Sequence, residues 1–143
     1  MPTSQIQSNP VPASSLEDIF GPVIYSYTRK QALADGFQVD VTRTAAEAGI
    51  KFPCFVTRAV WDSYVKVPPG VVCQDEAGRL WDLVWMTRCA IRATPPGKDR
   101  MTVSLMVRND NQRARMVRLT AVCAALDIDD ASPSITLMMP SED

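Results

Sequence analysis

The segment EAGRLWDLVWMTRCAIRA, residues 76–93, is the longest stretch of this sequence with a regular apolar period. One line of apolar positions holds Leu80, Val84 and Ile91, and a second line beside it holds Trp81, Trp85 and Cys89. Spacings of three and four residues predict an amphipathic helix that buries this stripe against the rest of the domain. We therefore expect both Trp81 and Val84 to belong to the core.

A sheet is expected after this helix, because Pro95-Pro96-Gly97 stops the helical period. Apolar and polar residues alternate over 101–107 and again over 116–123, and Asn109 to Gln112 between them is typical of a hairpin turn. A third apolar run covers residues 135–139. Since consecutive strands usually pair, the sequence predicts an α+β fold with a C-terminal antiparallel three-stranded meander, packed by the long helix and several short helices.

The short elements are expected before the long helix. Residues 28–36, 45–48 and 57–65 fit short helices, 37–41 alternate like a strand, and 52–56 form an apolar bridge. Leu16, Ile19 and Phe20 fit an amphipathic turn, and residues 23–25 fit a short extended piece. Residues 1–15 are rich in Pro, Ser, Asn and Gln and are expected to form a disordered tail. A single α+β domain is expected over residues 16–140.

Composition excludes several classes of protein. The chain has 143 residues, 46% of them hydrophobic and 22% charged, with a net charge of -1, which is typical of one globular domain. It contains no apolar run of the ~18 residues that a membrane span requires. The amino-terminal residues lack a signal-peptide pattern, so we expect a cytoplasmic protein. The four cysteines form no Cys-x-x-Cys pair and are expected to be reduced, with two disulfides as the alternative in an oxidising compartment.

Catalytic and cofactor patterns are scarce. The chain contains no histidine, which removes the commonest general base and metal ligand. No glycine-rich phosphate loop occurs, so no cofactor is expected. No metal is expected either, because histidine is absent and the cysteines lack the paired spacing of zinc sites. Asp75, Glu76 and Asp82 could serve acid and base roles, although acids at a helix start more often face water. Cys54 precedes an expected helix start, which would lower its thiol pKa, but a buried and inert thiol is the more ordinary interpretation.

A cluster of basic residues is the most suggestive feature for binding. The segment 88–118 holds eight basic residues, and its only acids are Asp99 and Asp110. The candidate binding residues around the hairpin are Arg108, Arg113, Arg115 and Arg118. Their guanidinium groups could contact phosphates or carboxylates. The alternative is a solvated hairpin whose charges offset Asp127, Asp129 and Asp130.

Three phrases carry a resemblance to a known family. They are IFGPVIYSYTRKQALADG from Ile19, VTRAVWD from Val56 and QDEAGRLWDLVWM from Gln74. With them the chain resembles a family of uncharacterised small proteins encoded on bacterial plasmids and integrative elements. The resemblance implies a bacterial, cytosolic accessory protein of a mobile genetic element. It implies no activity and no site residue.

Three functions remain open on the sequence alone. The first is a non-catalytic accessory protein that binds a protein of the host or the plasmid, such as one that handles DNA or defends against it. The second is a nucleic-acid-binding module that uses the arginine-rich hairpin. The third is a histidine-free enzyme. The absence of catalytic groups favours the first, and a protein is therefore the expected partner, with no membrane involved.

Overall fold

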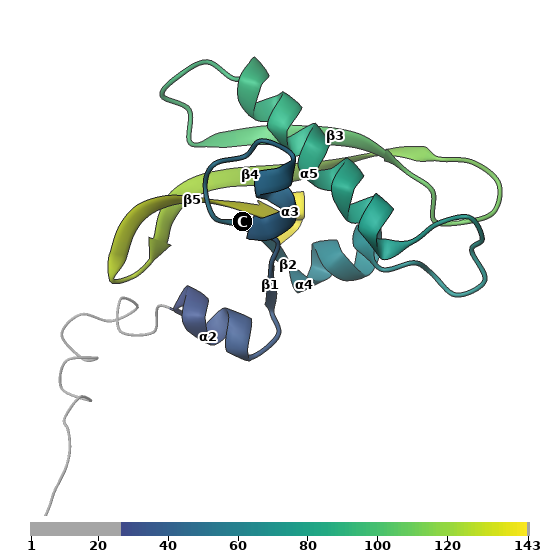
Figure 1. Ribbon diagram of the computed structural model, residues 1–143, viewed down its shortest axis with the longest axis horizontal. Coiled ribbons are helices and arrows are strands. Elements are labelled where there is room, and N and C mark those ends of the chain that lie inside the picture. Colours follow the sequence, from purple (N-terminus) through teal and green to yellow (C-terminus); the bar gives the residue numbers. More distant parts are fainter. Residues whose placement is uncertain (1–26, 143) are drawn as a thin grey trace, which may run out of the picture.

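The computed structural model describes residues 27–142 and consists of one five-stranded sheet with helices packed on it (Figure 1). The tail expected over 1–15, and the turn and extended piece expected over 16–25, lie outside the described residues. The strands are β1 (Gln38–Asp40), β2 (Cys54–Thr57), β3 (Arg100–Val107), β4 (Arg115–Asp127) and β5 (Asp130–Met138). The helical elements are α2 (Arg29–Ala34), α3 (Thr42–Glu47), α4 (Arg58–Val60), the π-helical η2 (Trp61–Val65), α5 (Glu76–Ala93) and the 3-10 turn η3 (Pro140–Glu142).

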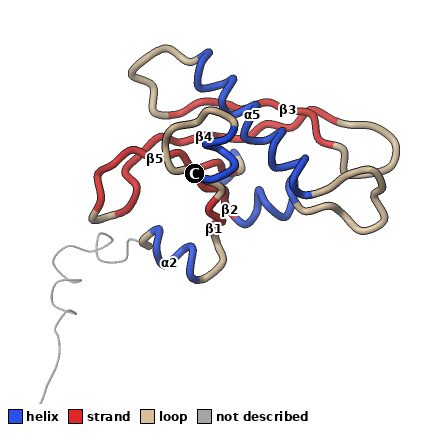
Figure 2. Tube along the Cα trace, viewed as in Figure 1, coloured by secondary structure: helices blue, strands red, loops and turns tan. Residues whose placement is uncertain are grey.

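The prediction of a sheet limited to a three-stranded meander is not confirmed, because the sheet has five strands in the order β1-β2-β5-β4-β3 (Figure 2). β5 lies in the centre, antiparallel to β4 and parallel to β2. The segment expected to be an apolar bridge is β2, whose four residues are all buried. A fully buried strand lacks the alternation of a half-exposed one, and here it is also very short. The mixed composition of helix and strand agrees with the predicted class.

The helix boundaries follow local capping rules. Thr28 and Gln31 form a reciprocal capping box at the start of α2, and the Thr57 hydroxyl accepts a hydrogen bond from Val60 N at 3.3 Å. At the start of α5 the Asp75 carboxylate accepts a hydrogen bond from Gly78 N at 2.6 Å. The predicted span of α5, residues 76–93, is confirmed.

The core lies between α5 and one face of the sheet. Leu83, Val84 and Thr87 of α5 are fully buried, and Val103 and Leu119 of the facing strands are buried with them. Val84 is therefore a core residue as predicted. Trp81 is 39% exposed, so its expected place in the core is wrong. The buried stripe runs through residues 83 and 87, roughly opposite the side of the helix that carries Trp81 and Trp85.

Arg29 holds α2 against the other end of the sheet. Its guanidinium donates hydrogen bonds to the Leu126 carbonyl at 2.6 Å and to the side chains of Gln38, Thr136 and Ser134 at 2.9–3.1 Å. It also lies 4.0 Å from the centroid of the Phe55 ring. Burial lowers the pKa of Arg29, while Asp127 opposes that shift. One side chain thus joins β1, β4 and β5 to the first described helix.

All four thiols are free, but their surroundings differ. Cys54 is buried, and desolvation raises its pKa to about 12. Cys73 is exposed, before α5. We expect the folded protein at pH 8 to be alkylated rapidly at Cys73 and at least about a hundredfold more slowly at Cys54, because only a thiolate in contact with solvent reacts. Mass spectrometry of a labelling time course measures both rates.

Denaturation without a reductant provides the control, since four thiols should then be modified. Fewer modified thiols would indicate a disulfide, and equal native rates would contradict the burial of Cys54.

Within residues 27–142, no helix has the length and apolar character to cross a bilayer.

Candidate functional site

Of the four arginines predicted as a binding surface, three contact Asp110 in the β3–β4 loop, namely Arg108, Arg113 and Arg115. Arg108 and Arg115 flank the loop between β3 and β4, and Arg113 is exposed within that loop. Arg118 is exposed further along β4, where it pairs with Ser104 of β3. The Arg115 guanidinium lies 3.8 Å from the Asp110 carboxylate. Arg113, Arg115 and Arg118 thus reach solvent, whereas Arg108 is half-buried.

Arg108 is occupied by contacts within the protein. Its guanidinium donates to the Asp110 carbonyl at 2.6 Å and to the carbonyl of Val72, and it approaches the Asn111 side chain at 3.3 Å. The Asp110 carboxylate accepts hydrogen bonds from Gln112 N and Arg113 N, which lower its pKa. Arg108 and Asp110 therefore fix the β3–β4 loop and connect it to the loop that precedes α5.

A pair of exposed tryptophans marks the outer side of α5. The Trp81 and Trp85 rings stack with centroids 6.0 Å apart at an interplanar angle of 18°. They are 39% and 41% exposed, and Arg88 lies 5.0 Å from the Trp85 ring centroid. Exposed tryptophans and arginines are enriched in the centres of protein interfaces. This side of α5 is the most interface-like surface among the described residues.

The strand beneath α5 has an unpaired edge. β3 is eight residues long and pairs only with β4, whereas β1 at the opposite edge has three residues. Cys123 N donates a hydrogen bond to the Asp99 carbonyl at 2.8 Å, so these two residues form a hydrogen-bonded pair. In the antiparallel register the backbone groups of every second residue after Asp99, from Met101 to Val107, therefore point toward β4. The backbone N–H and C=O groups of Thr102, Ser104 and Met106 consequently face outward. Within residues 27–142 no strand pairs with them.

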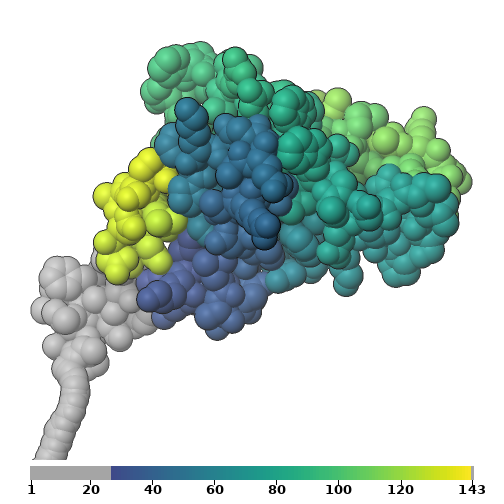
Figure 3. Space-filling model, viewed as in Figure 1, coloured from purple at the N-terminus to yellow at the C-terminus, as the bar shows by residue number. Residues whose placement is uncertain are grey.

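A groove runs between the free edge of β3 and the adjacent flank of α5, and we call it the α5–β3 groove. α5 packs chiefly on β3, and the two elements lie next to each other on the face shown in Figure 3. One part of the groove has a volume of about 320 Å³ and is lined by Asp82, Trp85, Met86, Ser104, Leu105, Met106 and Met116. Met106 and Met116 are 54% and 57% exposed. This part is therefore largely apolar, with an aromatic wall.

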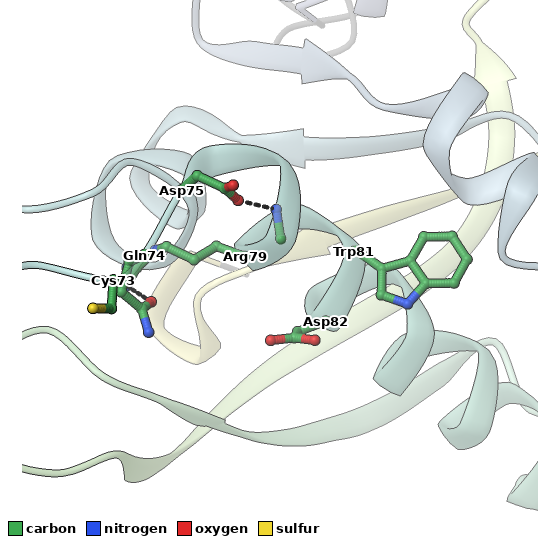
Figure 4. A pocket seen from close by; sticks show the side chains of 7 residues that line it. Cys73, Gln74, Asp75, Arg79, Trp81 and Asp82 are labelled. Atoms are coloured by element: carbon green, nitrogen blue, oxygen red, sulfur yellow. Dashed lines mark hydrogen bonds between the residues drawn. The ribbon is translucent and has the colours of Figure 1, made fainter.

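The second part of the groove adds charged and amide side chains to apolar ones, and we call it the polar part. It has a volume of about 250 Å³, shares Asp82, Leu105 and Met106 with the apolar part, and also contacts Arg79 and Arg108. Through Gln74, Arg79 and Asp82 it continues into a hollow of about 550 Å³ at the start of α5, which Figure 4 shows. In that view Trp81 extends along the helix away from Gln74 and Cys73.

Arg79 is a buried cation whose partners are neutral. It is 6% exposed and donates to the carbonyls of Val65 and Arg108, at 3.1 and 2.8 Å, and to the side-chain oxygens of Gln74 and Asn109, at 3.1 and 2.6 Å. Burial, then the neighbouring Arg108 charge, lowers the pKa of Arg79. No carboxylate within the described part of the chain forms an ion pair with it. The polar part of the groove therefore carries two guanidinium groups against one carboxylate, Asp82.

The other candidates from the sequence have structural roles or no visible role. Asp75 caps α5, and Asp82 lies at the rim of the groove. Over residues 27–142, no group of three or more cysteine or acidic side chains is placed to hold a metal ion. Sequence reasoning assigned both tryptophans to the core and did not single out Arg79. An arginine in the second turn of an amphipathic helix, on the flank of its apolar stripe, is the signal that was available.

Comparison with known proteins gives no relative: no protein-family model, no curated protein and no solved structure matches this chain. The geometry of the groove and of the tryptophan pair therefore carries the functional argument.

Proposed function

We propose that the protein is a non-catalytic binding protein that engages a protein partner through the α5–β3 groove and the tryptophan pair beside it. The observation that carries this proposal is the exposed Trp81–Trp85 stack next to an unpaired strand edge. A stable fold gains little from exposing two indole rings, whereas an interface gains much from burying them. The resemblance to proteins of plasmids and integrative elements suggests a partner from a bacterial host or from the mobile element itself.

The test is capture of a partner by the full chain from a bacterial lysate treated with nuclease. A captured protein is identified, purified and titrated against variants. We expect the double substitution Trp81→Ala with Trp85→Ala to weaken this binding at least about a hundredfold, because central aromatic residues dominate interface energy. The melting temperature should stay close to that of the parent, since both rings lie on the outer side of α5 and are partly exposed.

The matched control is Arg113→Ser with Arg115→Ser, which alters two exposed residues that do not line the groove. If the groove binds the partner, this variant should bind as well as the parent. If the arginine-rich hairpin instead binds nucleic acid, nuclease should abolish capture. For nucleic-acid binding by the arginine double variant, the slope of log affinity against log salt should then be smaller than for the parent by roughly one for each lost phosphate contact. Unchanged binding in the tryptophan variant would overturn the proposal.

A further inference from the structure

The outer edge of β3 has the features of a template for another strand. Its outward N–H and C=O groups belong to Thr102, Ser104 and Met106, which carry no charge. Natural proteins usually protect such an edge with proline, charge, a bulge or very short length. β3 has eight residues, no proline and a single charged residue, Arg100, at its first position. The opposite edge strand, β1, is protected by its length of three residues.

The groove beside this edge has two chemically different ends. Trp85, Met86 and Met106 make the end near the middle of α5 apolar, and Arg79 with Arg108 makes the other end positive. Both ends of the groove lie alongside β3, since Leu105 and Met106 of that strand line both. A segment lying along β3 would therefore meet apolar side chains at one end of the groove and two guanidinium groups at the other.

We propose that the α5–β3 groove binds an extended peptide segment of the partner as a sixth strand of the sheet, with an apolar side chain against Trp85 and Met106 and an acidic side chain near Arg79 and Arg108. Strand addition supplies main-chain hydrogen bonds for affinity, and the pockets beside the strand supply specificity. The acidic side chain balances the positive charge of Arg79 and Arg108, whose guanidinium groups keep most of their donors bonded within the protein and therefore attract it mainly by charge. This inference rests on the proposed function and specifies the form of the partner.

The probe is a library of random linear twelve-residue peptides, selected on the full chain and followed by synthesis of the best binder. Fluorescence anisotropy measures its affinity for the protein. N-methylation of single backbone amides along the peptide is the decisive series. Alternate amides of an added strand point to β3, so methylation at every second position should weaken binding at least about tenfold and methylation between them should not. An effect without this period of two would overturn strand addition.

Two variants test the edge and the charge separately. Ser104→Pro removes an outward N–H without removing a bond to β4, and we expect peptide binding to be lost. If that variant fails to fold, the N-methylation series alone decides the point. Replacing the acidic residue of the peptide by its amide should weaken binding at least about tenfold, because the attraction between the carboxylate and the two guanidinium charges is lost. The same change should matter much less with the variant Arg108→Gln, and an equal loss in both proteins would overturn the assigned position of the carboxylate.

The remaining outcomes separate this inference from the proposed function. If sedimentation finds a dimer that Ser104→Pro abolishes, the occupant of the edge is a second copy of this chain and the inference is wrong. If no peptide binds while the tryptophan variant still loses a folded partner, the proposed function stands and strand addition is wrong. If peptides bind with the expected period while that variant keeps its partner, the proposed function is wrong and the groove serves another ligand.

Discussion

Replacing Leu83 by alanine is expected to lower the free energy of unfolding by about 3 kcal/mol, because it removes a fully buried side chain and leaves a cavity between α5 and the sheet. Trp81→Ala, two residues earlier on the same helix, should cost less than about 1 kcal/mol, since that ring is partly in water and loses mainly its contact with Trp85. Urea denaturation followed by circular dichroism measures both values.

The pair of variants tests which side of α5 faces the sheet. Both substitutions create alanine in the same helix, so the change in helix propensity is small beside the expected difference. A larger loss for Trp81→Ala than for Leu83→Ala would mean that the tryptophan side is the buried one. That result would also remove the tryptophan pair from the proposed binding surface.

Replacing Arg79 by leucine should destabilise the protein by about 3 kcal/mol. The substitution deletes four hydrogen bonds, which join α5 to the segment before it, at Val65 and Gln74, and to the β3–β4 loop, at Arg108 and Asn109. Arg79→Lys should recover only part of this loss, because an ammonium group cannot reproduce the planar fork. In chemical denaturation, the free energy of unfolding should be highest for the parent, lower for the lysine variant and lowest for the leucine variant.

The matched control is Arg92→Leu, which removes an exposed arginine from the last turn of the same helix. Its expected cost is below about 1 kcal/mol, from the lost interaction with the helix dipole. If Arg79→Leu is as mild as this control, the guanidinium does not organise the loops. Its four hydrogen bonds would then contribute little to the free energy of unfolding.

The long helix was the most predictable part of the fold, and its orientation was the least. Residues 76–93 have clear start and stop signals, and the structure confirms both boundaries. Yet their apolar residues surround most of the helix, so the period alone does not tell which stripe is buried. Leu83 and Val84 face the sheet, whereas Trp81 and Trp85 form the outer side.

The sheet was predicted only where strands alternate. β3 and β4 have one face in contact with helices and were recognised by their period of two. β2 is buried throughout, and β1 has only three residues, so neither provides enough pattern to reveal its pairing partner. The groove could not be predicted, because it arises from the position of α5 over an edge strand, which is a property of tertiary packing.

The central position of β5 has a consequence for how the protein is made. On the ribosome, β1 with β2 and β3 with β4 can each form a local antiparallel pair as they emerge. These two pairs are not neighbours in the sheet, and the strand that separates them is synthesised last among the five. Until it arrives, the nascent chain holds two strand pairs with unsatisfied inner edges, a state in which long-range pairing is slow and aggregation is favoured. Folding of this chain should therefore complete in one late, cooperative step, when β5 inserts between the two strand pairs.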